Sequence, residues 1–195
     1  MEVYLMRHGE TDLNLEDRLQ GLVDCPLNGT GLAQAGAAGE RVRAAGLTFD
    51  RVYSSPLRRA VDTACLAAGC APEGLRLDER LLEIDYGPYD ARPFTELGPE
   101  MFAFFRDPEH VDPPAGVESI AALLSRVGAF LAALAEDPAP ERVLVVTHGV
   151  AIRAFLGHIQ GDGSAAVWGM PVENCALYRT RLENGRWTEA ELALG

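Results

Sequence analysis

The sequence predicts an α/β fold, a three-layer α/β/α sandwich with a mostly parallel central sheet and an antiparallel edge at the C-terminus. Three observations support this prediction. Short apolar runs alternate with helical segments, as in a sheet built from βαβ units. The run Val143–Val146 is continuous and apolar, which is typical of a parallel strand covered on both faces. Two strand-like segments surround Glu183-Asn184-Gly185, which indicates a hairpin that extends the sheet.

The chain length fits one domain, which we expect to span residues 1–195, and 48% hydrophobic residues are usual for a globular protein. Neither a membrane-length apolar run nor the pattern of a signal peptide is present in the sequence. The four cysteines lack CxxC spacing, which favours free thiols over a zinc or redox motif. We therefore expect a cytoplasmic protein without a membrane partner.

The formal net charge of −12 works against binding of a polyanion such as nucleic acid. An anionic substrate would need a local cluster of arginines to overcome that background. The sequence therefore predicts no nucleic-acid partner.

The first predicted strand, Val3–Met6, places Arg7 and His8 at its carboxyl end, where open α/β sheets bind their ligands. A guanidinium supplies a planar fork of donors, and an imidazole carries protons or attacks as a nucleophile near neutral pH. The pair is a candidate anion site. The alternative is a strand end where Arg and His simply meet solvent.

The next segment, 12–31, is rich in Asn, Asp and Gly and predicts a long loop over the end of this strand. A helix follows from about Gly31 to Ala45, with Asn28 or Thr30 as its cap and Gly46 as its stop.

A second strand is predicted over Phe49–Tyr53. Ser54 and Ser55 then offer a capping hydroxyl ahead of Pro56 and a helix over 57–69. Backbone N–H groups at such a helix start also point at an anion.

A short strand is predicted over Leu75–Leu77, and Gly87-Pro88 marks a turn. The aromatic residues of segment 92–114 indicate a short helical excursion, and we expect a lid or rim at about 88–116. An amphipathic helix over 117–136 precedes the strand that ends at Thr147. That strand runs directly into His148-Gly149 and a helix over 150–159.

Four separate segments of the chain resemble the histidine phosphatase superfamily, which includes cofactor-dependent phosphoglycerate mutase and many small phosphatases. They are RHGET at 7–11, with Asn14 and the Arg18–Gly21 segment after it, SPLRRA at 55–60, EIDYG at 83–87 and THG at 147–149. Their order and spacing match the family over nearly the whole chain.

The resemblance implies a phosphomonoester hydrolase that acts through a phosphohistidine on a small phosphorylated metabolite, with no cofactor or metal. His8 would be the nucleophile and Glu83 the general acid, while His148 would donate to the phosphoryl oxygens as they gain charge. Arg7 and Arg59 would hold the phosphoryl oxygens. Further phosphate contacts are implied for Asn14, Gln20, Gly21 and Gly149.

The same residue types also fit metal-binding and purely structural roles. His8, His148 and Glu83 are metal-ligand types, although two nearby arginines would repel a cation. Glu83 could instead cap a helix or pair with Arg80. Arg58, His110 and His158 are interpreted as solvated or structural residues.

The segment that would hold a second phosphate or a carboxylate in longer mutases contains no lysine here and only two arginines, Arg92 and Arg106. This favours hydrolysis of a monoester with a partly apolar group. Tyr89-Asp90-Ala91 and the 115–118 segment also depart from the family pattern near the substrate.

Several alternatives therefore stay open: mutase-type phosphoryl transfer, α-ribazole-phosphate phosphatase, broad-specificity phosphatase, protein phosphohistidine phosphatase, and a binding protein without activity. The apolar C-terminal hairpin would either complete the core or form the edge of a homodimer.

Overall fold

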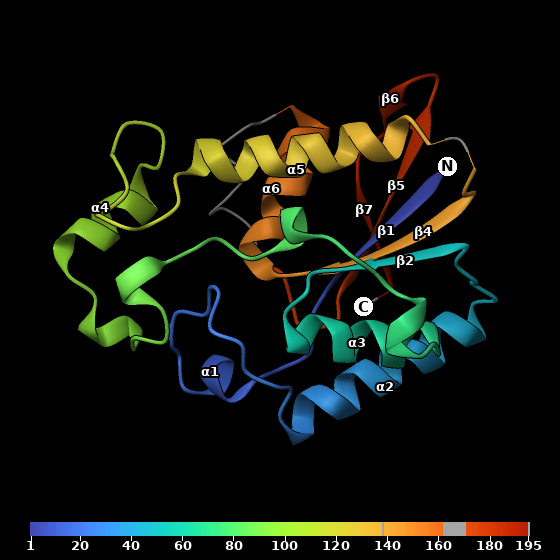
Figure 1. Ribbon diagram of the computed structural model, residues 1–195, viewed down its shortest axis with the longest axis horizontal. Helices are drawn as coiled ribbons and strands as arrows, with labels where there is room; N and C mark the ends of the chain where they lie inside the picture. The colour runs from blue at the N-terminus through green and yellow to red at the C-terminus, as the bar shows by residue number, and fades with distance from the viewer. Residues whose placement is uncertain (138, 162–170, 195) are drawn as a thin grey trace.

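A seven-stranded sheet crosses the described part of the protein, which is residues 1–137, 139–161 and 171–194 of a computed structural model (Figure 1). The strand order is β3-β2-β4-β1-β5-β6, and β7 also pairs with β5. The strands are β1 (Glu2–Arg7), β2 (Arg51–Ser54), β3 (Arg76–Leu77), β4 (Arg142–Thr147), β5 (Leu177–Glu183), β6 (Arg186–Trp187) and β7 (Glu191–Leu194).

The first four strands pair in parallel, whereas β5 is antiparallel to β1, and β6 and β7 are antiparallel to β5. Asn184 and Gly185 both have positive φ, at 51° and 74°, as a tight hairpin turn between β5 and β6 requires. The predicted fold class, with its antiparallel C-terminal edge, is confirmed.

Helices cover both faces of the sheet (Figure 1). Helices α2 and α3 pack together on one face, and α5 and α6 pack on the other. The α-helices are α1 (Asp12–Leu15), α2 (Gly29–Ala44), α3 (Arg58–Ala68), α4 (Pro99–Arg106), α5 (Ile120–Ala135) and α6 (Gly149–Gln160). The 3₁₀ helices are η1 (Pro72–Gly74), η2 (Glu79–Leu81), η3 (Gly87–Tyr89) and η4 (Phe94–Glu96).

Alternate residues of β1 supply two hydrophobic cores, because successive side chains of a strand point to opposite faces. Val3 and Leu5 join the core under α5 and α6. Tyr4 and Met6 join the core under α2 and α3. Both faces are buried, which explains why β1 and β4 read as continuous apolar runs.

The register of the parallel strands brings three loop starts to one edge of the sheet. Arg7 pairs with Thr147, and Ser54 pairs with Val146. The residues that follow these strand ends are His8, Ser55 and His148. Segments far apart in the sequence therefore converge at the carboxyl edge.

Two details of the 12–31 segment differ from the prediction. It contains the one-turn helix α1, which starts because Thr11 and Asn14 form a reciprocal capping box. Helix α2 begins at Gly29 with Asn28 as its cap, so Thr30 lies inside the helix and is not the cap.

The predicted serine cap of α3 is wrong. The cap position is Leu57, without a side-chain hydrogen bond, and the amide of Arg58 donates to Asp24 Oδ1 at 2.7 Å. The hydroxyl of Ser55 accepts from the amide of Leu57 at 3.4 Å, ahead of the helix, and lies 2.8 Å from His148 Nε2. Strand β2 also ends one residue later than predicted, at Ser54.

The two ends of segment 88–116 meet, since a Cβ atom at Gly87 would lie only 2.2 Å from the carbonyl oxygen of Gly116. Between these ends, α4 stands to one side of the layered body in Figure 1. Met101 and Phe104 of α4 are fully buried, which anchors the segment in the larger core.

Backbone hydrogen bonds also join this segment to the loop after α1, between Leu19 and both Ala91 and Arg92. Across the described residues, none of the helices combines the length and the apolar character needed to cross a membrane.

Candidate active site

A pocket of about 430 Å³ opens at the carboxyl edge of the sheet, where the predicted residues converge. Its lining contains both polar and apolar residues. The polar or small lining residues are Arg7, His8, Asn14, Arg18, Gln20, Glu83, Gly149 and Arg153. The apolar and aromatic lining residues are Leu19, Tyr86, Phe94, Phe105 and Val150.

His8 follows β1 directly, and its side chain is buried apart from the edge that reaches the pocket. Its Nδ1 lies 2.7 Å from the carbonyl oxygen of Gly9. Because a carbonyl only accepts, Nδ1 carries the proton and Nε2 keeps its lone pair. Burial, together with Arg59 and Arg7, holds the pKa of His8 well below its ordinary value, so the ring is neutral at pH 7.

Arg7 ends β1, and its guanidinium lies between Val172 and the start of α6. Nη1 donates to the carbonyl oxygen of Val172 at 2.5 Å, whereas Nε is buried and has no hydrogen-bond partner among the described residues. A Cβ atom at Gly149 would lie 3.5 Å from this Nε. A buried N–H group without a partner is costly, so this donor is suited to an anionic ligand at Gly149.

The Glu83 carboxylate is fixed at the N-terminus of α6. Oε2 accepts from the amide of Val150 at 3.0 Å, and Oε1 accepts from the amides of Ala151 and Ile84 at 2.9 and 3.0 Å. The first amides of a helix lack intrahelical partners and carry partial positive charge. Glu83 therefore does cap a helix, and it also lines the pocket. Arg80 pairs with Asp78 instead.

Arg59 and His148 are completely buried, behind His8. Arg59 Nε donates to His148 Nδ1 at 3.2 Å, so Nε2 of His148 carries the proton and donates to the hydroxyl of Ser55. The rings of His8 and His148 meet edge to face, with centroids 5.1 Å apart. Burial and the charge of Arg59 hold the pKa of His148 well below its ordinary value.

The loop residues implied by the resemblance take two different positions. Asn14 and Gln20 line the pocket, and both bond to Thr11. The amide of Gly21 donates to Asp90 Oδ1 at 2.7 Å, and its carbonyl oxygen accepts from Arg59 Nη2 at 2.7 Å. Gly21 is not one of the described residues that line the pocket. Its backbone instead bonds to Asp90 and Arg59.

The pocket wall thus contains six of the predicted residues, namely Arg7, His8, Asn14, Gln20, Glu83 and Gly149. Arg59, His148 and Gly21 belong to the layer behind them. Arg58 is solvated beside Asp62, and His110 and His158 are exposed, as expected.

Sequence reasoning missed Arg153 and Tyr86 on the wall and Ser55 behind it. Arg153 was detectable, because it lies one helical turn after Gly149 and residues four apart share a helix face. In the described part of the chain, no group of three or more His, Cys, Asp or Glu side chains is arranged to hold a metal ion.

Known proteins resemble this chain in sequence and in fold. The model of the family described as "Histidine phosphatase superfamily (branch 1)" matches residues 3–194 of this chain. A protein of Salmonella paratyphi B named "Probable phosphoglycerate mutase GpmB" is 35% identical over 190 residues, covering 96% of this chain and 87% of that protein.

Two solved structures also superpose on this chain. The α-ribazole phosphatase of Shigella flexneri has a TM-score of 0.88 at 25% identity, covering 100% of this chain and 96% of the other. A mycobacterial glucosyl-3-phosphoglycerate phosphatase has a TM-score of 0.85 at 25% identity, covering 98% and 97%. With its match over nearly the full length and these relatives, the chain belongs to the histidine phosphatase superfamily, branch 1.

Proposed function

We propose that this protein hydrolyses small phosphomonoesters through a covalent phosphohistidine on His8. The observation that carries the proposal is the hydrogen bond between His8 Nδ1 and Gly9, which leaves the nucleophilic Nε2 at the pocket. The depressed pKa of His8 keeps that nitrogen unprotonated at neutral pH.

In the first step, the phosphoryl group binds beside Arg7 Nε, Asn14 and the first residue of α6, Gly149. An anion at this place meets a guanidinium and the positive end of a helix. His8 Nε2 attacks phosphorus, the N–P bond forms, and the P–O bond to the leaving group breaks. Glu83 gives a proton to the departing oxygen.

In the second step, a water molecule attacks the phosphohistidine. Glu83 takes a proton from that water, a P–O bond forms, and the N–P bond breaks to restore neutral His8. Inorganic phosphate then leaves.

Arg59 and His148 are proposed to stabilise the phosphoryl oxygens from the buried side of His8, where bound substrate would replace Ser55 as the acceptor of the His148 Nε2 proton. Gln20 and Gly21 support the same loop. Three of the five N–H groups of Arg59 have acceptors, at His148, Val23 and Gly21. These contacts orient the guanidinium before substrate arrives, which is how preorganised charge lowers a barrier.

Segment 88–116 is proposed to act as a rim that shapes the leaving-group side of the pocket. Phe94 and Phe105 come from this segment and line the pocket together with Tyr86. An aromatic wall supports a leaving group that is partly apolar.

The names of the relatives supply candidate substrates, namely α-ribazole phosphate, glucosyl-3-phosphoglycerate and phosphoglycerate. Phosphoryl transfer between two positions is the second candidate, because the Salmonella relative is named a mutase.

The decisive experiment is to trap the intermediate. Wild-type protein quenched during turnover of labelled phosphomonoester should carry acid-labile phosphate, and His8→Ala should carry none. His158→Ala, which changes an exposed histidine, serves as the matched control. Phosphate retained on serine or cysteine would overturn the proposal.

A substrate panel would separate the alternatives. p-Nitrophenyl phosphate, sugar phosphates, α-ribazole phosphate, phosphoglycerates and a phosphohistidine protein should be compared, with release of phosphate and mutase exchange measured separately. Hydrolysis without exchange supports a phosphatase, exchange supports a mutase, and turnover of none supports a protein without activity.

The site needs no metal in this proposal, since Arg7 and Arg59 supply the positive charge. Activity should therefore survive exhaustive treatment with a chelator. Recovery of lost activity by Zn²⁺ or Mg²⁺ would instead favour the metal-site interpretation of His8, His148 and Glu83.

We also infer a cytoplasmic location, because the four cysteines are free thiols, the state that a reducing compartment maintains. The homodimer stays a prediction, which sedimentation of the purified protein would test.

A further inference from the structure

We propose that Arg126 is a positioning residue that fixes Glu83 in place for proton transfer to the leaving group. The inference rests on the proposed function, in which Glu83 is the general acid. Arg126 lies in the middle of α5 and has no place in the pocket wall among the described residues.

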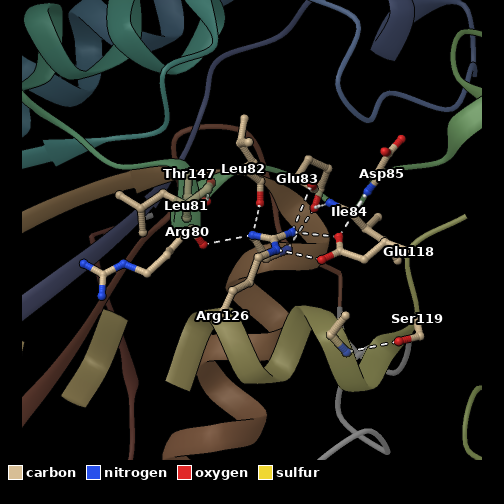
Figure 2. A network of polar contacts seen from close by, with 12 residues as sticks. Arg80, Leu81, Leu82, Glu83, Ile84, Asp85, Glu118, Ser119, Arg126 and Thr147 are labelled. Carbon is tan, nitrogen blue, oxygen red and sulfur yellow. Dashed lines mark hydrogen bonds and ion pairs between the residues drawn. The ribbon is translucent and has the colours of Figure 1, made fainter. Parts of the chain in front are cut away.

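The Arg126 guanidinium binds the backbone of the segment that carries Glu83 (Figure 2). Nη1 donates to the carbonyl oxygens of Arg80 and Leu82, at 2.9 and 2.6 Å. Nη2 donates to the carbonyl oxygen of Glu83 itself at 3.0 Å. One rigid fork therefore holds three carbonyl groups, at Glu83 and in the residues before it.

Glu118 fixes the other side of this fork. Its carboxylate accepts from Arg126 Nε at 2.8 Å and from Nη2 at 3.0 Å, and the same carboxylate accepts from the amide of Asp85 at 3.2 Å. The amide of Glu118 donates back to the carbonyl oxygen of Asp85 at 2.8 Å. The Arg126–Glu118 pair thus clamps the chain immediately before and after Glu83.

The clamp matters because residues 82–86 lie between the 3₁₀ helices η2 and η3, outside any strand. Backbone groups there lack ladder partners that would fix their position, and Arg126 supplies donors to the carbonyl oxygens of Leu82 and Glu83. The carboxylate of Glu83 is held separately, by the amides of α6. Arg126 of α5 therefore fixes the backbone of Glu83, and α6 fixes its carboxylate.

Loss of the fork should move Glu83 without touching the groups that hold phosphate. Proton delivery is needed for an alkyl phosphate, whose leaving alkoxide is strongly basic. It is not needed for p-nitrophenyl phosphate, whose phenolate leaves unprotonated. A displaced Glu83 should therefore slow the first substrate far more than the second.

The test compares kcat and KM of wild type and Arg126→Met on an alkyl phosphate and on p-nitrophenyl phosphate. We expect kcat on the alkyl phosphate to fall about 10- to 100-fold, part of the roughly 10²- to 10⁴-fold that general acid catalysis contributes. On p-nitrophenyl phosphate, kcat should change less than about 3-fold, with KM little altered on both. Equal losses on both substrates would indicate a merely structural role and would overturn the inference.

Arg80→Met is the matched control. The Arg80 guanidinium also ties η2 to α5, through the carbonyl oxygen of Ala129 at 3.0 Å and the ring of Phe130, and its contacts lie away from the Glu83 backbone. This variant removes the same charge from the same interface and should affect both substrates equally. If Arg80→Met lost as much more kcat on the alkyl phosphate than on p-nitrophenyl phosphate as Arg126→Met does, the result would count against the clamp.

Arg126→Lys separates position from charge and protects the test against a variant that does not fold. Lysine keeps the charge, which also acts on His148, but loses the planar fork. We expect Arg126→Lys to remain slower on the alkyl phosphate than on p-nitrophenyl phosphate, relative to wild type. Full recovery of the wild-type ratio of kcat on the two substrates would show that charge alone matters and would overturn the inference.

A double-mutant cycle with Glu83→Gln completes the design. In the Glu83→Gln background, Arg126→Met should cost little more on the alkyl phosphate, since the group it positions is gone. If the fold-loss in kcat of the double variant equalled the product of the two single-variant losses, the two residues would act independently and the proposal would be contradicted. If wild type turned over both substrates while Glu83→Gln lost no more kcat on the alkyl phosphate than on p-nitrophenyl phosphate, that result would refute both the general-acid role of Glu83 and the positioning role of Arg126. Absence of wild-type turnover would instead refute the proposed function.

Discussion

Arg59 Nε donates a hydrogen bond to His148 Nδ1 at 3.2 Å, between two side chains that are both fully buried. The bond fixes the tautomer of His148, with its proton on Nε2 toward Ser55. The same guanidinium holds the carbonyl oxygens of Gly21 and Val23. One arginine therefore orients both the second histidine and the loop beside the pocket.

Arg59→Lys should lower both activity and stability, because a lysine cannot reproduce three bonds in a planar fork. We expect kcat on p-nitrophenyl phosphate to fall at least about 10-fold, and the free energy of unfolding in urea to drop about 1–3 kcal/mol from buried groups left without partners. Arg58→Lys, at the exposed neighbouring position, is the control. If Arg59→Lys kept the wild-type kcat and free energy of unfolding, Arg59 would not have the orienting role assigned to it.

The protein should lose stability as pH falls below about 6.5. Burial holds the pKa of His8 and of His148 well below the ordinary value, so the folded state keeps both rings neutral while the unfolded state binds protons. Each ring then contributes up to about 1.4 kcal/mol of lost stability per pH unit, down to its lowered pKa.

Urea unfolding between about pH 8 and pH 5 measures this slope. The stability of the His8→Gln/His148→Gln double variant should depend less steeply on pH than that of wild type over the same range. A wild-type stability that rises as pH falls through this range would be inconsistent with neutral buried rings.

Gly149→Ala should block phosphate binding without unfolding the protein. The added Cβ would make ordinary contacts, 3.5 Å from Arg7 Nε and 3.8 Å from Glu83 Oε2. It would occupy the space proposed for a phosphoryl oxygen, so we expect the Kd for inorganic phosphate to rise at least about 10-fold, or about 1.4 kcal/mol. Calorimetric titration measures Kd, and the melting temperature should stay within a few degrees.

Gly36→Ala in α2, where a Cβ meets no atom within 4 Å, controls for the change of residue type. Unchanged phosphate affinity in Gly149→Ala would place the phosphoryl group elsewhere in the pocket.

Arg153→Met should alter selectivity for charged leaving groups. Arg153 lines the pocket one turn beyond Gly149, and its charge acts on both Arg7 and Tyr86. A charge-assisted hydrogen bond of about 1.5–3 kcal/mol corresponds to a KM increase of roughly 10- to 100-fold for a monoester whose leaving group carries a carboxylate. KM for an uncharged alkyl phosphate should stay within about 2-fold.

Steady-state kinetics on the two substrates provides the measurement, with Arg186→Met in β6 as the control for charge. Equal changes for both substrates would assign Arg153 to phosphate binding or to structure.

The predictions from sequence were reliable where a local signal determines the structure. The apolar runs before Arg7 and before His148 predicted two parallel strands, and the strand-end rule then placed both histidines at one edge. The Asn-Gly turn predicted the C-terminal hairpin. The family and the phosphatase class are confirmed by the match over residues 3–194 and by the phosphatase relatives.

Predictions from sequence were wrong where a distant partner engaged a group that a local signal assigned elsewhere, or where an element was too short to leave a pattern. Ser55 precedes Pro56 and reads as a helix cap, yet its hydroxyl bonds to His148, 93 residues away, and the cap position itself is Leu57. Thr11 and Asn14 make a capping box inside a segment that reads as loop, because one turn of helix leaves no periodic pattern.

The sequence by itself thus determined the strands, the edge at which they end and the chemical types of the site residues, because each depends on neighbours along the chain. Only the tertiary structure decided which residues face the pocket and which lie behind it. Glu83 faces the pocket because amides of α6, 67 and 68 residues away, hold its carboxylate, and Arg126, 43 residues away, holds its backbone. Hydrogen bonds over such separations follow from the packing of α5 and α6 on the sheet, which no local pattern encodes.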